Sequence, residues 1–317
     1  MVKRKKITIL GAGKVGASIA FGFVMDGTAS EIVMVDIDRD KAEGEVIDLT
    51  QSAVFCPAVK IVNGTYEDAV NSDIVVITLG VARKPGQTRL DLANINVGII
   101  KQVIPQIVKY ASTAMYVVVS NPVDILTYAI HKYSGLPSHQ IIGSGTLLDT
   151  IRLSSAIADY AKISSRNVHS YVFGEHGDSS MVPWSLVTIG GAPIKQYCKD
   201  IFQKSEEETN ADLEKLQEEI RSSGAKIIKL KGATYYGIAL TVRKICDSIM
   251  RNSDSIMPLS TMLNGEYGIS GVCMSVPCLL GGSGISKVLP LSVTPEEQEK
   301  LVASANALKA IIKQLDM

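Results

Sequence analysis

The sequence predicts an α/β fold in which a doubly wound parallel sheet is followed by a second domain. A glycine-rich turn, Gly11 to Gly16, stands between a short apolar run and an apolar, helix-like segment. Strand-like and helix-like stretches then alternate up to about Gly143, which is typical of a parallel sheet covered on both faces. The length of 317 residues leaves room for a further unit with its own core.

The glycine turn has the flanking elements of a dinucleotide-binding fingerprint. Ile7 to Leu10 forms the preceding strand-like run, and Ala17 to Met25 is apolar throughout, as in a buried helix. A second β-branched run, Ile32 to Val35, ends at Asp36. A strand, a glycine turn, a helix and a strand closed by an acid make up a Rossmann dinucleotide unit. The alternative is a glycine-rich turn in some other α/β protein.

Each residue type in the fingerprint suits a dinucleotide. Gly11 permits the tight turn, Gly13 lets the backbone approach the pyrophosphate, and Gly16 lets the helix pack closely. The helix N-terminus offers free N–H groups and partial positive charge to the phosphates. Asp36, about 20 residues beyond Gly16, can accept both ribose hydroxyls. Its carboxylate would repel a 2′-phosphate and Ile37 adds no cation, so we expect NAD rather than NADP.

Polar residues follow two later strand-like runs, where ligands bind in such sheets. Ile74 to Thr78 leads into the loop Gly80 to Leu92, which has glycine near both ends, a central proline and three cations within seven residues. The loop could close over an anionic ligand, or it could be a solvated basic loop. Met115 to Val119 leads to Asn121. A cis Asn121-Pro122 bond would aim the amide into the cleft, whereas an ordinary turn residue is the alternative.

The second half of the chain carries the groups for proton transfer. Asp149 and Arg152 stand three apart on a predicted helix, so they either face one cleft or form an intrahelical ion pair. Val168 to Phe173 is predicted to be a strand that delivers His176, within Gly174 to Asp178, at its end. A carboxylate such as Asp149 on one ring nitrogen would leave the other free to exchange a proton. Arg152 could grip a substrate carboxylate with its planar fork.

The bulk composition narrows the class of partner. The chain is 46% hydrophobic and 20% charged, with 32 basic and 32 acidic residues. A net charge of zero argues against nucleic acid or an anionic membrane as the main partner, and no apolar run has membrane-spanning length. Five scattered cysteines without C-x-x-C spacing indicate neither disulfides nor a metal site. We therefore expect a cytoplasmic protein with reduced thiols, no secretory signal and no metal.

Taken together, these motifs resemble the L-lactate/malate dehydrogenase family over essentially the whole chain. The resemblance is carried by Gly11 to Gly16, Arg83 to Arg89, Ser120 to Pro122, Asp149 to Arg152, and Gly174 to Asp178. It implies an NAD-binding Rossmann domain over residues 1–143 and an α+β catalytic domain over residues 144–317. It also implies a homo-oligomer, a tetramer rather than a dimer, that acts on a small 2-hydroxy or 2-oxo acid.

The resemblance implies a role for each reacting group. His176 exchanges the hydroxyl proton, and Asp149 stabilises the protonated imidazole. Arg152 holds the C1 carboxylate, while Arg89 and Asn121 contact the carbonyl oxygen. Expulsion of water as the loop closes would strengthen these contacts. The residues implied for cofactor binding are Gly11, Gly13, Val15, Gly16, Asp36, Thr78, Gly80, Val119 and Asn121.

The motifs point in two directions on the substrate. Relatives that act on malate tend to have arginine at the position of Arg83, where it pairs with a second carboxylate. A methyl group there would leave a desolvated charge unpaired, at a cost of several kcal/mol. Leu147 to Thr150, Gly174 to Asp178, and Ala233 to Gly237 resemble the lactate branch instead, and malate relatives more often have a small residue at Thr234. Giving more weight to charge, we expect malate and oxaloacetate, with L-lactate and pyruvate as the alternative.

Other possibilities have less support in the sequence. Some lactate relatives are activated by fructose 1,6-bisphosphate through an arginine and a histidine. His169 matches the histidine, but Ser154 replaces the arginine, so we expect weak activation or none. An NAD-dependent glycosidase would need Cys or His metal ligands near the nicotinamide, and none is visible. A binding protein without catalysis would have lost some of the reacting groups, yet all are present.

Overall fold

A nine-stranded sheet forms the centre of the protein. The computed structural model describes residues 5–81, 86, 88–315 and 317. Six parallel strands in the order β3-β2-β1-β4-β5-β6 make one half of the sheet, which is the doubly wound dinucleotide-binding order and confirms the predicted fold class. They are β1 (Lys6–Leu10), β2 (Glu31–Val35), β3 (Lys60–Asn63), β4 (Ile74–Ile77), β5 (Met115–Val118) and β6 (Ile141–Gly143).

The same sheet continues into the second half of the chain. A long hairpin, β10 (Ser255–Asn264) and β11 (Ser270–Gly281), pairs antiparallel to β6, and β12 (Gly284–Val288) adds the outer edge. Ser260 of β10 is the residue opposite Gly143 of β6. Strands of the C-terminal half therefore lie directly beside the end of the dinucleotide-binding unit.

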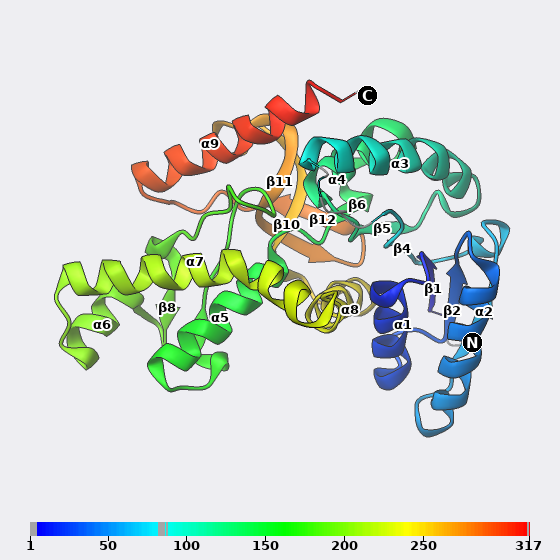
Figure 1. Ribbon diagram of the computed structural model, residues 1–317, viewed down its shortest axis with the longest axis horizontal. Coiled ribbons are helices and arrows are strands. Elements are labelled where there is room, and N and C mark those ends of the chain that lie inside the picture. The colour runs from blue at the N-terminus through cyan, green and yellow to red at the C-terminus, as the bar shows by residue number, and fades with distance from the viewer. Residues whose placement is uncertain (1–4, 82–85, 87, 316) are drawn as a thin grey trace.

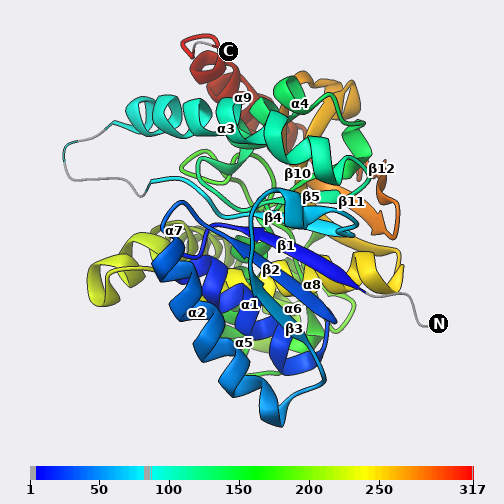
Figure 2. The same cartoon turned by 90° about the vertical axis from the view of Figure 1, so that its right-hand side faces the viewer.

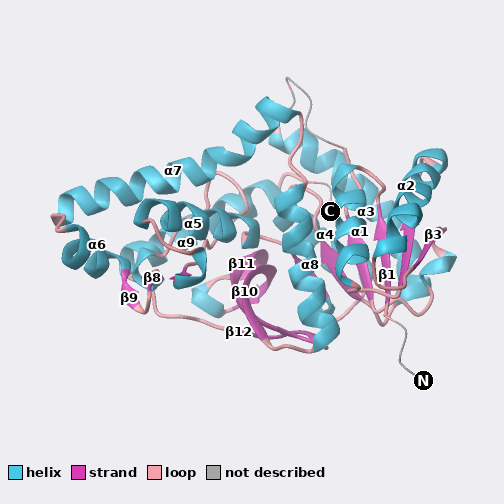
Figure 3. Ribbon diagram, turned by 90° about the horizontal axis from the view of Figure 1, so that it is seen from below, coloured by secondary structure: helices cyan, strands magenta, loops and turns pink. Residues whose placement is uncertain are grey.

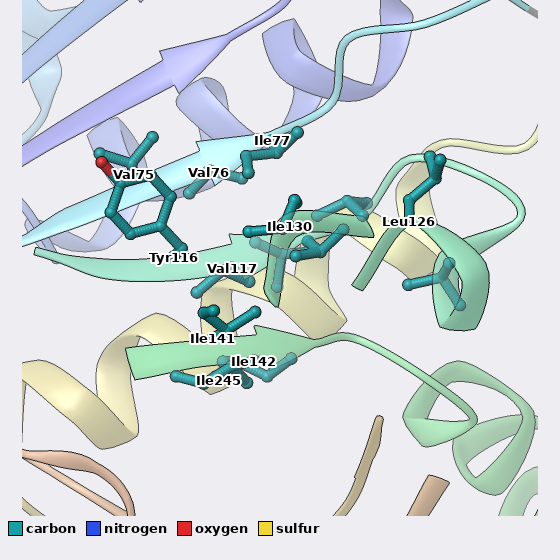
Figure 4. Packing of buried hydrophobic residues seen from close by; sticks show 14 of the residues in the cluster. Val75, Val76, Ile77, Tyr116, Val117, Leu126, Ile130, Ile141, Ile142 and Ile245 are labelled. Atoms are coloured by element: carbon teal, nitrogen blue, oxygen red, sulfur yellow. The ribbon is translucent and has the colours of Figure 1, made fainter. Parts of the chain in front are cut away.

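Helices cover both faces of the parallel strands (Figures 1 and 2). On one face lie α3 (Arg89–Ala111) and α4 (Val123–Ser134), packed against each other. On the other lie α1 (Lys14–Asp26), α2 (Arg39–Ser52) and α8 (Tyr236–Arg251), with α1 against α8. Burial on both faces explains why β4 and β5 are apolar along nearly their whole length. Side chains of β4, β5 and β6 interdigitate with Leu126 and Ile130 of α4 and Ile245 of α8 (Figure 4).

A second core lies at the other end of the molecule (Figure 3). It is enclosed by α5 (Leu147–Ala161), α6 (Ile194–Phe202), α7 (Glu206–Lys231) and the small sheet β7 (Val168–His169), β8 (Thr188–Ile189) and β9 (Ala192–Pro193). The C-terminal helix α9 (Pro295–Ile312) packs against β11. Short 3₁₀ turns complete the connections at Ala53–Phe55, Glu67–Ala69, Ser138–Gln140, Ser165–Asn167, Trp184–Leu186 and Glu266–Gly268.

Helix ends follow their local sequence. Thr294 caps α9 through a reciprocal capping box with Glu297, and Pro295 occupies the first turn. Ser205 caps α7 in the same way, and Gly232 ends that helix with φ +83°. Of the helices in the described ranges, none is both long and apolar enough to cross a membrane.

Two expectations on secondary structure need correction. The strand predicted over residues 168–173 is limited to Val168–His169, because the chain then leaves its small sheet and bridges to other segments at Phe173 and Gly174. The long strand β10 was not predicted; it contains Pro258 and mixes polar with apolar residues, so its sequence has no clear strand periodicity. Its pairing with β11 and β6 makes it a strand.

Candidate active site

The glycine turn between β1 and α1 is tightly enclosed. Gly11 has φ +107°, and a Cβ on Gly16 would lie 1.9 Å from the Gly11 carbonyl oxygen, so neither position accepts a side chain without movement. Thr78 Oγ1 donates to the carbonyl oxygens of Leu10 and Gly11, at 3.0 Å each. Val15 packs against the core from the first turn of α1. Thr78 and Val15, implied as cofactor contacts, therefore also hold the turn in place.

The N-terminus of α1 is open. Gly13 is its N-cap and supplies no side-chain cap, and a Cβ there would approach only Lys41 Nζ, at 3.9 Å. Asp36 follows β2 and faces the turn, where its Oδ2 accepts the Ala12 N–H at 2.6 Å and its Oδ1 accepts the Asp38 N–H at 2.9 Å. Free amides and an oriented carboxylate thus lie on either side of the same turn, as a dinucleotide phosphate and ribose require.

The ends of β4 and β5 are tied together by one side chain. The side chain of Asn96, on α3, accepts the Val81 N–H at 2.9 Å and donates to the Asn121 carbonyl oxygen at 2.7 Å. The Asn121-Pro122 bond is cis, which is one of the two possibilities that the sequence left open, and the Asn121 side-chain oxygen accepts the Val123 N–H at 3.3 Å. Val119 is buried, whereas Asn121 is exposed beside it.

The structure brings His176, Asp149 and Arg152 together. Nδ1 of His176 lies 2.5 Å from Asp149 Oδ2, and a guanidinium nitrogen of Arg152 donates to Asp149 Oδ1 at 3.0 Å. The ion-pair interpretation of the Asp149 and Arg152 spacing is therefore confirmed, and the same carboxylate also serves the histidine. A Cβ on Gly224 of α7 would lie 3.8 Å from the Arg152 guanidinium, so the absence of a side chain there leaves space beside it.

The electrostatics of this triad favour a charged pair. Burial alone would raise the pKa of Asp149, but the charge and hydrogen bond of His176, followed by those of Arg152, hold it below its usual value. Burial alone would lower the pKa of His176, but the charge and hydrogen bond of Asp149, with a smaller contribution from Asp124, raise it. The imidazole is therefore poised to take up and hold a proton.

Three separate elements fix the backbone at His176. Gly174, with φ +94°, donates to the Ser275 carbonyl oxygen of β11 at 2.9 Å and accepts the Ser275 N–H at 3.0 Å. The backbone N–H of Glu175 donates to Ser304 Oγ of α9 at 2.9 Å. The N–H of His176 itself donates to Asp124 Oδ2 of α4 at 2.7 Å. Sequence reasoning gave no role to Asp124, Ser275 or Ser304, since they are far from His176 in the chain and match no motif.

Arg89 is the first residue of α3 and reaches the turn that follows His176. Its guanidinium lies 2.6 Å from Asp178 Oδ2 and 3.8 Å from Glu175 Oε1. The Arg89 side chain is 44% exposed and that of Asp178 is 76% exposed. Asp178 was quoted in the sequence motif but was not recognised as a partner for the arginine. Arg83, the expected substrate-selecting residue, lies outside the described residues.

Two other predicted residues lie apart from these contacts. Thr234 is half-buried in the connection between α7 and α8, and no hydrogen bond within the described ranges ties it to the triad. His169 is exposed on β7, and Ser154 on α5 pairs with Ser170 at 2.9 Å. Among the residues that the structure describes, no group of three Cys, His, Asp or Glu side chains is arranged to hold a metal ion.

Models of known protein families match both halves of the chain. Residues 5–143 match the NAD binding domain of lactate/malate dehydrogenase, and residues 146–316 match the alpha/beta C-terminal domain of the same enzymes. The chain belongs to the lactate/malate dehydrogenase family. It is an NAD-dependent oxidoreductase that acts on a CH–OH group, and the family resemblance inferred from its motifs is confirmed.

Several full-length relatives are named L-lactate dehydrogenase. The chain is 45% identical to an L-lactate dehydrogenase of Acetivibrio thermocellus, with 99% of this chain and 98% of that protein covered. It is 44% identical to L-lactate dehydrogenase 1 of Clostridium acetobutylicum, with 98% of each covered. A minor L-lactate dehydrogenase from Enterococcus mundtii, crystallised in a ligand-bound form, superposes with a TM-score of 0.94 at 38% identity, and 99% of each chain is covered.

These relatives overturn the expectation of malate. That expectation gave the charge of one residue, Arg83, more weight than the three motifs that resemble the lactate branch. The L-lactate dehydrogenases match this chain from end to end at 44–45% identity, so the malate interpretation is wrong. The physical reason is that discrimination depends on the whole pocket, and a single charge near a substrate does not define its selectivity.

Proposed function

We propose that this protein is an L-lactate dehydrogenase, which interconverts pyruvate and L-lactate with NADH and NAD. The observation that carries the proposal is the carboxylate of Asp149 shared between His176 at 2.5 Å and Arg152 at 3.0 Å. This arrangement places a proton carrier beside a cation suited to a substrate carboxylate. The names of the full-length relatives support lactate as the substrate.

The dinucleotide cradle fits NAD. The uncapped α1 N-terminus at Gly13 would hold the pyrophosphate, and Asp36 would accept the ribose hydroxyls and disfavour a 2′-phosphate. Gly80, Val119 and Asn121, at the ends of neighbouring strands, would border the nicotinamide half. When bound, NADH supplies the hydride that reduces the 2-oxo carbon.

His176 would carry the proton. With Nδ1 bonded to Asp149, the other ring nitrogen remains to donate to the pyruvate oxygen, and in the reverse direction to accept the lactate hydroxyl proton. Asp149 stabilises the imidazolium, so the proton is held until it is transferred. A buried carboxylate that also bonds Arg152 cannot rotate freely, and this fixes the plane of the imidazole ring.

The cations would bind and polarise the substrate. Arg152 keeps guanidinium nitrogens beyond the one used by Asp149, and the space beside Gly224 leaves room for a bidentate grip on the C1 carboxylate. Arg89 would move from Asp178 to the carbonyl oxygen, where its charge stabilises the developing negative charge. Asn121 would donate to the same oxygen. Thr234 would border the C3 end of the substrate, and Arg83, which lies outside the described residues, stays a predicted contact with that end.

Three further assignments belong to the same proposal. We place the division of the chain at 143/144, with the NAD-binding unit before it and the catalytic unit after it. We assign the enzyme to the cytoplasm, which fits five cysteines that are all free. We also assign it a homo-oligomeric state, a tetramer before a dimer, which sedimentation would measure.

A direct comparison of two substrates tests the proposal. NADH oxidation should be at least about tenfold more efficient, in kcat/KM, with pyruvate than with oxaloacetate, as expected from differential binding of the C3 group. Equal or higher efficiency with oxaloacetate would refute the lactate assignment. His176→Asn should lose about 10²–10⁴-fold in kcat, which is the range of general acid–base catalysis. The control is His139→Asn, an exposed histidine in a 3₁₀ turn, which should retain full activity.

A further inference from the structure

A second carboxylate, besides that of Asp149, lies at the histidine. We propose that Asp124 is a positioning residue for His176, which fixes the backbone that carries the imidazole and controls, through its own charge, how firmly the ring holds a proton. The inference rests on the proposed role of His176 as the proton carrier. It goes further by assigning a function to Asp124, which follows the Ser120 to Pro122 motif and has no role in it.

The geometry of Asp124 is that of a buried anchor. It is the second residue of α4 and is 2% exposed. Its Oδ2 accepts the backbone N–H of His176 at 2.7 Å, across 52 positions of sequence. The partial positive charge of the α4 N-terminus favours a carboxylate at this position. The contact therefore links the helix that follows Asn121 directly to the turn that carries the proton donor.

The other oxygen of Asp124 has no well-formed hydrogen bond. Among the described residues, Asp124 Oδ1 and the Ser260 hydroxyl of β10 are both buried without a partner of good geometry. Burial raises the pKa of Asp124 to about 6, an effect partly offset by Ser260 and by the N–H and charge of His176. A carboxyl that is incompletely solvated in this way can change its charge in the same pH range as a histidine.

The charges around the imidazole explain why Asp124 matters. From α5, His176 faces Asp149 and Arg152, which carry opposite charges and bond to each other. Asp124, on α4, bonds the backbone N–H of His176, and its charge also acts on the ring; no cation in the described part of the chain is bonded to it. The pair on α5 is nearly neutral as a whole, so the state of Asp124 decides whether the surroundings of the imidazolium carry net negative charge.

The remaining neighbours do not replace this effect. Glu175, on the turn itself, raises the pKa of Asp124 and lies 3.8 Å from the Arg89 guanidinium. Buried Cys273 of β11 faces Asp124 and, because burial raises its own pKa well above the usual value, stays neutral. When Asp124 is ionised, His176 holds its proton to higher pH. When Asp124 is protonated, that support is lost, so the two groups titrate as a coupled pair.

The test uses Asp124→Asn in the free enzyme. Asparagine keeps the size of the side chain and an oxygen for the His176 N–H, and its amide nitrogen can donate to the unpartnered Ser260 hydroxyl. The chain has four histidines, so the imidazole resonances of His176 can be followed by NMR and assigned with His176→Asn. We expect the pKa of His176 to fall by roughly one unit, as for loss of a nearby charge. The pH limb of pyruvate reduction should move to lower pH by the same amount.

Two results would overturn the inference. One is a reduced kcat with an unmoved His176 titration, which would mean that Asp124 is only structural. The second is a wild-type His176 titration that follows a simple one-proton curve between pH 4 and 8. This measurement needs no variant, so it tests the inference even if Asp124→Asn fails to fold. A broadened or two-step curve is expected for coupled groups. The exposed α5 variant Asp159→Asn is the matched control and should leave the titration unchanged. Because the NMR titration needs neither substrate nor NAD, it remains decisive if the lactate assignment fails.

Discussion

Asp149 bonds both His176, the proposed proton carrier, and Arg152, the proposed cation for the substrate carboxylate, so its replacement tests the proposed site directly. Asp149→Asn preserves the shape but removes the charge. One amide oxygen cannot serve both neighbours as two carboxylate oxygens do. If the amide oxygen accepts from His176, the amide N–H groups face the Arg152 guanidinium, which is also a donor. If the amide is rotated by half a turn, its N–H groups face the His176 ring nitrogen, which should itself donate. Either orientation makes the protonated imidazole of His176 less stable relative to the neutral form.

The structure allows the size of the effect to be worked out. A hydrogen bond to a charged group contributes about 1.5–3 kcal/mol, and the 2.5 Å contact on a carboxylate that is 8% exposed belongs in the upper part of that range. A loss of about 2–3 kcal/mol corresponds to roughly 30- to 160-fold in kcat/KM for pyruvate at pH 7. Asp149 raises the pKa of His176, so its removal should lower that pKa. The falling limb of pyruvate reduction and the rising limb of lactate oxidation should both move to lower pH.

Steady-state kinetics from pH 5 to 9 in both directions provide the assay. The loss of a partner for Arg152 also costs stability, so the Tm of each variant must be recorded to separate misfolding from lost chemistry. Asp159→Asn makes the same change at an exposed position of α5 and should match wild type. A loss of activity with both pH limbs unmoved would refute the reasoning that Asp149 acts by stabilising the imidazolium.

Two further predictions follow from the geometry. Asp178→Asn should raise kcat/KM for pyruvate by up to about fivefold, because it frees Arg89 from an exposed ion pair worth less than about 1 kcal/mol; a decrease in kcat/KM would mean that the pair orients Arg89 rather than competing with substrate. Gly16→Ala should weaken NADH binding and lower Tm, because the new Cβ would lie 1.9 Å from the Gly11 carbonyl oxygen. Its control is Gly44→Ala on α2, where a Cβ meets nothing within 4 Å. Helix propensity predicts that this control gains about 1 kcal/mol in stability. Equal losses of Tm and NADH binding in both variants would contradict the steric argument.

The features that the sequence predicted well depend on local chemistry. The turn Gly11 to Gly16 and the buried strands up to residue 143 are each encoded within a few neighbouring residues. A β-branched run that is covered on both faces and a glycine with positive φ leave patterns that a short stretch of sequence already shows. The pairing of Asp149 with Arg152 was accessible for the same reason, since both lie on one helix.

The substrate was not decided by local pattern. Arg83 is a single position, and its charge suggested malate, whereas relatives that match the whole chain are L-lactate dehydrogenases. A pocket selects a substrate by the sum of its contacts, and contacts from segments distant in the chain cannot be judged from one position. The charge of Arg83 alone therefore does not predict the substrate.

Sequence alone therefore determined the dinucleotide unit and the fold class, and it named the residues that we propose to react. Only the tertiary structure decided how those residues are held. The turn at His176 is fixed by Asp124, Ser275 and Ser304, at sequence separations that reach 129 residues, and strand β10 is a strand because β6 and β11 pair with it. Such contacts leave no periodicity or spacing to detect, because hydrogen bonds between distant segments depend on packing that forms only when the chain folds.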